Sequence, residues 1–95
     1  MFQKRDYTCL DPKYFHIIVK GKREITIQSK NTGHYWYLQS TGRPGKLAVL
    51  IYHKHRYSYP YHRHGQSSTL PKAVRSIIHH DRYQLTKERR TAATM

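Results

Sequence analysis

The stretch that decides the fold is Tyr14–Gln39, YFHIIVKGKREITIQSKNTGHYWYLQ. Apolar residues occupy every second position in three runs within it: Tyr14–Lys20, Arg23–Gln28 and His34–Gln39. This period of two is typical of β-strands with one buried face. The runs are separated by Lys20-Gly21-Lys22 and by Asn31-Thr32-Gly33, and glycine accepts the positive φ that tight turns often need. We therefore expect consecutive antiparallel strands joined by hairpins.

Leu47–Tyr52 is the most apolar run of the chain and predicts a fourth, central strand. The residues expected to face the core are Phe15, Ile17, Val19, Ile25, Ile27, Trp36, Leu38, Leu47, Val49 and Ile51. The other face of the sheet would carry Tyr14, His16, Thr26, Tyr35, Tyr37 and Tyr52. The segment 57–68 has Pro60 and Gly65 but no clear period, so we expect a long loop with extended character there.

An amphipathic helix is predicted over 70–81. Thr69 can cap its N-terminus, and Pro71 falls in the first turn, where proline is tolerated. One side of this helix would carry Leu70, Ala73, Val74, Ile77, Ile78 and Asp81, and the other Lys72, Arg75, Ser76, His79 and Arg82. The predicted fold class is α+β, with a small antiparallel sheet of three to four strands covered on one face by this C-terminal helix.

The 95 residues suffice for one domain. We expect a flexible N-terminal arm at 1–13, a single compact α+β domain at 14–85 with a last short strand at 83–85, and a disordered C-terminal tail at 86–95. The N-terminal residues MFQKRDYTCL lack the apolar segment of a secretory signal, and no apolar run approaches membrane-spanning length. Because the single cysteine, Cys9, cannot form an internal disulfide, a reducing cytoplasmic location is expected.

Charge is unevenly distributed along the chain. Lys and Arg number 18 and Asp and Glu number 5, which gives a formal net charge of +13. No acidic residue lies between Ile25 and His80, although this centre holds seven of the eight histidines. Self-repulsion of this size disfavours a compact chain, and an anionic partner relieves it. The pattern predicts nucleic acid or a nucleoprotein complex as partner, and no membrane partner, because no long basic amphipathic helix is expected.

The segment Tyr52–His64 interleaves aromatic rings with cations. Tyr and His rings stack on bases, and adjacent Lys and Arg bind phosphates. Some of these tyrosines could instead belong to the core, since aliphatic residues are few. The candidate nucleic-acid-binding residues are Lys54, Arg56, Tyr57, Tyr59, Tyr61, Arg63, Lys72, Arg75, Tyr35, Tyr37, Arg43 and Lys46.

Histidine pairs raise the possibility of a metal site. His53/His55 and His62/His64 would each share a strand face, and His79-His80-Asp81 offers a further set. Three observations oppose a metal: cations lie beside these histidines, carboxylates are scarce, and the spacing is not that of a zinc motif. The sequence therefore predicts no metal site and no cofactor.

Three functions are compatible with these patterns. The leading one is non-enzymatic nucleic-acid binding. The alternative is a small accessory or inhibitor protein of the kind that mobile elements encode, docking on a nucleic-acid-handling complex such as a CRISPR effector. The third is a metal-independent ribonuclease, with His55 and His80 as acid and base and Arg56 assisting. We expect no enzyme, because no spacing selects one histidine pair and the carboxylates for two-metal chemistry are missing.

Overall fold

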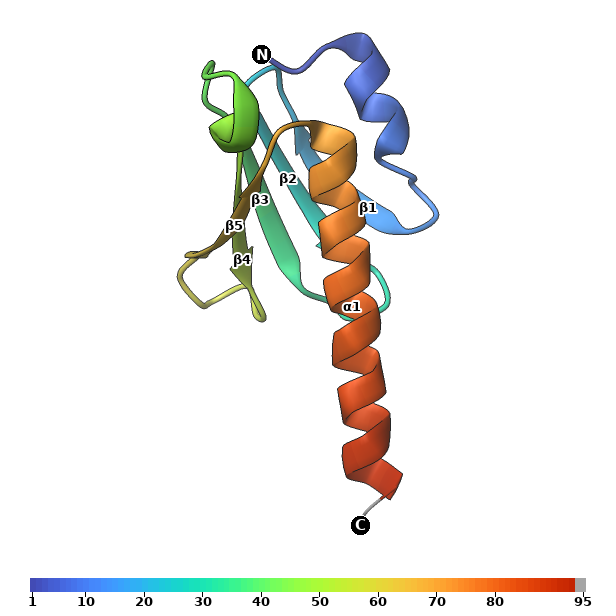
Figure 1. Ribbon diagram of the computed structural model, residues 1–95. Coiled ribbons are helices and arrows are strands. Elements are labelled where there is room, and N and C mark those ends of the chain that lie inside the picture. Colours follow the sequence, from blue (N-terminus) through green and yellow to red (C-terminus); the bar gives the residue numbers. More distant parts are fainter. Residues whose placement is uncertain (94–95) are drawn as a thin grey trace.

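The computed structural model describes residues 1–93, and side chains as far as residue 88. A five-stranded antiparallel sheet in the order β1-β2-β3-β4-β5 is followed by a long helix that lies against one of its faces (Figure 1). The α+β prediction is confirmed. The elements are η1 (Lys4–Cys9), β1 (Phe15–Lys20), β2 (Glu24–Ser29), β3 (Tyr35–Ser40), η2 (Gly45–Leu47), β4 (Val49–Lys54), β5 (His62–Ser67) and α1 (Leu70–Ala93).

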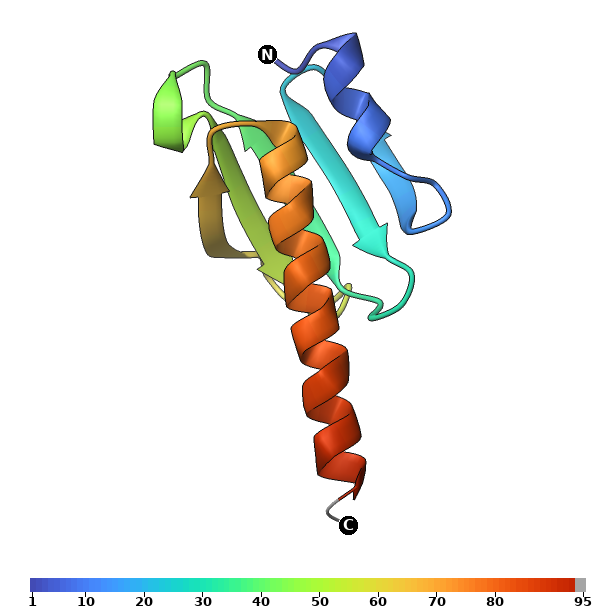
Figure 2. The same cartoon turned by 45° about the vertical axis from the view of Figure 1, so that its right-hand side comes forward.

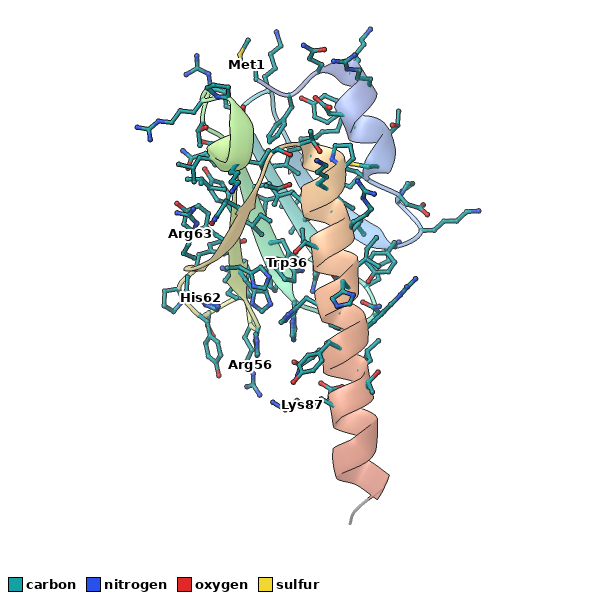
Figure 3. The ribbon with its side chains drawn as sticks, in the orientation of Figure 1. Met1, Trp36, Arg56, His62, Arg63 and Lys87 are labelled. Carbon is teal, nitrogen blue, oxygen red and sulfur yellow. The ribbon has the colours of Figure 1, made fainter. Side chains whose placement is uncertain are left out.

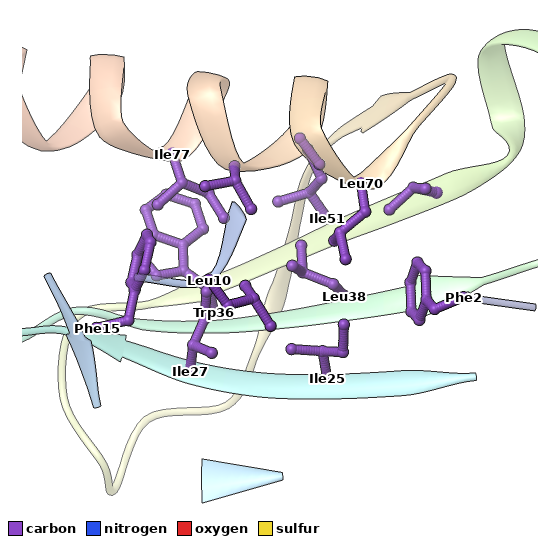
Figure 4. Close-up of a cluster of buried hydrophobic side chains, with 13 residues drawn as sticks. Phe2, Leu10, Phe15, Ile25, Ile27, Trp36, Leu38, Ile51, Leu70 and Ile77 are labelled. Atoms are coloured by element: carbon purple, nitrogen blue, oxygen red, sulfur yellow. The ribbon is translucent and has the colours of Figure 1, made fainter. Parts of the chain in front are cut away.

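The core fills the space between α1 and the sheet (Figure 4). The sheet contributes Ile25, Ile27, Trp36, Leu38, Val49 and Ile51, and the helix contributes Leu70, Ala73, Val74 and Ile77. These are residues that the alternating and helical patterns place inward. Two others differ from that expectation. Val19 is 46% exposed, because a β-bulge after Ile17 interrupts the alternation, and Leu47 is 41% exposed because it lies in η2 rather than in β4.

Strand β5 forms where the sequence predicts a loop. Its residues, HRHGQS, are exposed or half-buried, so they show no apolar alternation. Antiparallel pairing with β4 holds it in place, with Val49 opposite Ser67 and Ile51 opposite Gly65. The sheet therefore has one strand more than the expected three to four, and backbone hydrogen bonding rather than hydrophobic burial explains it.

The N-terminal residues, expected to be a flexible arm, pack onto the sheet. Phe2 and Leu10 lie in the core with 7% and 4% of their surface exposed, and η1 connects them. The Phe2 N–H donates to the Lys22 carbonyl at 2.7 Å, and the Tyr7 hydroxyl donates to the Gly21 carbonyl at 2.9 Å. Two isolated apolar residues in a charged segment leave no periodic signal, which is why the sequence pattern missed this packing.

Helix α1 runs well beyond the predicted range of 70–81 and projects past the sheet (Figures 1 and 2). It includes 83–85, expected as a strand, and continues through Ala93, so most of the expected tail is helical; residues 94–95 lie outside the described residues. No glycine or proline interrupts 82–93, and Lys, Glu, Arg and Ala there are good helix formers. The predicted cap is present, since the Lys72 N–H donates to the Thr69 hydroxyl at 3.2 Å. Within the described part, no helix has the length and apolar character needed to cross a bilayer.

Replacing Leu10 by Ala should lower the free energy of unfolding by about 2–5 kcal/mol, because it leaves a cavity in the core. The matched control is Ile18→Ala, since Ile18 is 46% exposed, and it should cost less than about 1 kcal/mol. Urea denaturation followed by Trp36 fluorescence measures both variants. Equal losses in the two variants would mean that the N-terminal segment is not packed.

Candidate functional site

Five tyrosines gather on the sheet face opposite α1. Tyr35, Tyr37 and Tyr52 alternate with buried Trp36 and Ile51, so they project away from the helix. The Tyr37 ring lies 5.7 Å from Tyr52 and 5.9 Å from Tyr61, and Tyr57 lies 6.0 Å from Tyr35, measured between ring centroids. We call this surface, formed by Tyr35, Tyr37, Tyr52, Tyr57, Tyr61 and Lys54, the tyrosine face.

Lys54 fixes a positive charge within the tyrosine face. Its ammonium lies 5.4, 5.1 and 4.4 Å from the ring centroids of Tyr35, Tyr57 and Tyr61, within cation–π range. It also donates a hydrogen bond to the Tyr57 carbonyl at 2.9 Å. Burial raises the pKa of Tyr61, so this phenol stays neutral at pH 7 and does not oppose a bound anion. The result is an aromatic surface with one positioned cation.

A cleft lined by arginines continues the same sheet face. Its volume is about 600 Å³, and its charged lining residues are three arginines, Arg23, Arg43 and Arg63, and one carboxylate, Glu24. Gln39 and Leu50, paired with each other, also line it and lie two residues along their strands from Tyr37 and Tyr52. Side chains two apart share a face, so the cleft and the tyrosine face form one surface. We call Arg23, Arg43 and Arg63 the arginine cleft.

The predicted binding residues divide into two groups. Tyr35, Tyr37, Lys54, Tyr57, Tyr61, Arg43 and Arg63 lie in the tyrosine face or the arginine cleft. The other predicted residues lie outside these two surfaces. Arg56 lies 5.9 Å from the Tyr59 ring in the β4–β5 loop, and Lys46 is exposed in η2. Lys72 and Arg75 are exposed on α1, on the other side of the sheet.

Two members of this surface were missing from the predicted set. Tyr52 is half-buried on the face where the alternation predicts it, and Arg23 follows a turn whose position relative to Arg43 and Arg63 no local pattern reveals. In Figure 3, Arg63 projects from the edge strand away from α1, whereas Trp36 lies next to the helix.

A second cluster, of histidines, lies on the helix side of the sheet. Its inner members are His34 from the β2–β3 turn, His53 from β4 and His80 from α1, and one ring nitrogen of each lies within 4.8 Å of the other two. The outer members contact these rings: His55 stacks on His34 at 4.2 Å, and His64 lies 5.0 Å from His80. We call this set, with His62 beside His53, the histidine cluster.

Packing holds the inner rings. The indole of Trp36 stacks on His53 with centroids 4.1 Å apart, and Nε2 of His53 lies 3.0 Å from Nδ1 of His34. One of these two nitrogens donates and the other accepts, so the tautomer of one ring determines the tautomer of the other. The predicted pairs thus come together, but residues distant in sequence, His34 and His80, complete the cluster. His79, in contrast, is exposed.

Four members of the histidine cluster, His34, His53, His64 and His80, have a lowered pKa and are neutral at pH 7. Burial, followed by the charges of neighbouring histidines, lowers the pKa of His53 to about 3. Burial also lowers the pKa values of His34, His64 and His80, and for His80 the nearby Asp81 carboxylate partly offsets this shift. His55 and His80, predicted as a ribonuclease pair, both belong to the histidine cluster.

A buried carboxylate positions the cluster. Asp81 has no exposed surface, and it accepts hydrogen bonds from the Tyr14 hydroxyl at 2.8 Å and the Thr32 hydroxyl at 3.0 Å. Burial and this bond raise the pKa of Tyr14 to about 12. Thr32 in turn accepts the His34 N–H at 3.2 Å, and Gly33 supplies the positive φ of 77° that the turn requires. Tyr14 therefore faces the helix, contrary to the sequence expectation, and Asp81 fixes the turn that carries His34.

Comparison of the chain with protein-family models, curated proteins and solved structures finds no match.

The stability of the metal-free protein should depend on pH through the histidine cluster. The pKa values of these imidazoles are lowered on folding, so the unfolded chain takes up protons first as the pH falls below about 6.5. The free energy of unfolding should be level above about pH 7 and fall steadily from about pH 6.5 towards pH 4. Urea denaturation in EDTA at a series of pH values measures it.

General charge repulsion is the alternative cause of such a fall, and salt separates the two. Repulsion between surface charges is screened at about 0.5 M salt, whereas the cost of charging a buried imidazole is not. A fall that disappears in high salt would contradict the assignment to the histidine cluster.

Proposed function

We propose that the protein binds single-stranded nucleic acid without catalysis, using the tyrosine face and the arginine cleft. The observation that carries this proposal is the arrangement of Lys54 among three tyrosine rings, on the same surface as a cleft lined by three arginines. Bases would stack on the rings, and phosphates would bind in the cleft and at Lys54. Stacking contributes about 1–3 kcal/mol per base in proteins that bind single strands this way.

Charge supports the same partner. The net charge is +13, and acidic residues are absent from 25–80, which includes β3, β4 and β5. An extended single strand could follow the surface from the arginine cleft past Tyr37 and Tyr52 to Lys54, because these residues succeed one another along β3 and β4. Single strands expose the base faces that stacking needs, whereas an intact duplex does not. The single cysteine suits a role in the reducing cytoplasm.

A nucleoprotein complex is the second partner that this surface could serve. In that case the protein would dock on a complex that already holds nucleic acid, as an accessory or inhibitor protein does. Bare oligonucleotides distinguish the two: the proposal expects binding without any other protein. Labelled RNA should also remain intact in EDTA, since the proposal includes no ribonuclease step.

Removing charge from the arginine cleft should weaken binding more than removing equal charge from α1. Arg43→Ala with Arg63→Ala should lower the affinity for a labelled single-stranded oligonucleotide at least roughly tenfold, and reduce the slope of log K against log salt by about 1.4, at 0.7 per phosphate. Lys72→Ala with Arg75→Ala is the matched control and should change affinity little. Fluorescence anisotropy between 50 and 200 mM salt measures both. A larger loss of affinity in the α1 variant would mean that the helix, and not the arginine cleft, binds the nucleic acid.

Tyr57 provides a separate test of stacking. Its side chain is 79% exposed, so Tyr57→Ala should leave the melting temperature unchanged within a few degrees. The affinity for single strands should fall roughly 5- to 150-fold if one base stacks on this ring. Tyr83→Ala removes a ring that is 62% exposed on α1 and is the control. If both variants bind like the wild type, stacking at Tyr57 is wrong.

A further inference from the structure

The inner histidines converge as metal ligands do. His34, His53 and His80 come from a turn, a strand and a helix, and one nitrogen of each lies within 4.8 Å of the others. Two zinc-bound imidazole nitrogens at about 2.0–2.1 Å in tetrahedral geometry lie about 3.3 Å apart. The nitrogens of His34 and His53 are 3.0 Å apart, so the pair is close to this spacing without metal.

A second, independent feature concerns one of these histidines. Nε2 of His80 is buried and has no hydrogen-bond partner among the described residues. Buried polar atoms in folded proteins nearly always have a hydrogen-bond partner. A buried ring nitrogen without one, among other imidazole rings, therefore suggests a missing ligand. Imidazole nitrogen is a preferred ligand of divalent zinc, copper and nickel.

We propose that His34, His53 and His80 bind one divalent transition-metal ion, for which zinc is the best-suited common ion. Three histidines are a ligand set found in zinc sites that keep a fourth position open. Coordination through the facing nitrogens requires that the donating ring of the His34–His53 pair shift its proton to its other nitrogen, and that the three nitrogens, now within 4.8 Å, adopt the spacing of about 3.3 Å. Burial keeps the rings in the neutral form that binds metal, which supports the site.

The cations that argued against a metal lie elsewhere in the fold. Lys54 follows His53 on β4 and therefore points to the opposite sheet face, where its ammonium contacts tyrosine rings. Arg63 donates to the Gly65 carbonyl at 3.0 Å and to the Gln66 side chain at 3.3 Å. The Asp81 carboxylate, one residue from His80, favours a bound cation, as do carboxylates around many metal sites. One of the three reasons for expecting no metal, the adjacent cations, is therefore weaker than the sequence suggests, because the sheet separates Lys54 from the site.

Zinc titration of the metal-free full chain by calorimetry at about pH 7.5 tests this proposal. The wild type should bind one zinc ion per chain with a dissociation constant of micromolar or below, and zinc should raise its melting temperature. His80→Ala should weaken binding at least tenfold. His79→Ala removes the adjacent exposed histidine and should bind zinc as the wild type does. Equal losses in both variants, or undiminished binding by His80→Ala, would overturn the proposal.

The outer histidines could bind zinc weakly on their own, and NMR of the unmodified protein separates that case. Zinc should shift the ring nitrogen signals of His34, His53 and His80 at one equivalent. Shifts confined to His55, His62 and His64 would mean surface binding only and would contradict the inner site. This measurement needs no variant, so it decides the matter even if His80→Ala fails to fold.

Discussion

The structure depends on one buried carboxylate. Asp81 has no exposed surface, and a charge without water must be satisfied by hydrogen bonds to avoid a large desolvation cost. The hydroxyls of Tyr14 and Thr32 provide those bonds from positions 67 and 49 residues away in sequence. This interaction fixes the rotation of α1 on the sheet. The same interaction turns His80 towards the sheet. It also holds the β2–β3 turn in the position from which His34 contacts the other histidines.

Because successive side chains of a strand point to opposite faces of the sheet, the histidines and the tyrosine face lie on opposite sides of it. His53 and Lys54 are neighbours on β4, yet one lies buried under Trp36 on the helix side and the other lies among tyrosine rings on the open side. The helix side gathers imidazoles that burial keeps neutral, and the open side gathers permanent cations and rings. The proposed zinc site and the proposed nucleic-acid surface are therefore on opposite faces of one sheet, and each can be altered without touching the other.

The sequence predicts those parts of the structure that local patterns encode. Alternation gives β2, β3 and β4 with their inward residues, and the Thr69 cap gives the start of α1. It does not predict β5, because backbone pairing with β4 holds this strand and it has no apolar alternation. It also does not predict that Phe2 and Leu10 of the N-terminal segment lie in the core. In the candidate sites, local sequence places Tyr35 and Tyr37 on one strand face. The meeting of His34, His53 and His80, and of Arg23 with Arg43 and Arg63, depends on contacts between distant segments that no spacing reveals.

The central claim is that nucleic acid binds the sheet face opposite α1. The most direct measurement follows the ring signals of the nine tyrosines by carbon–proton NMR while a single-stranded oligonucleotide is added to the full chain. The account predicts that the signals of Tyr37, Tyr52, Tyr57 and Tyr61 shift, while those of Tyr83 on α1 and Tyr14 beside Asp81 stay in place. Shifts of the Tyr83 signals with an unchanged tyrosine face would contradict it.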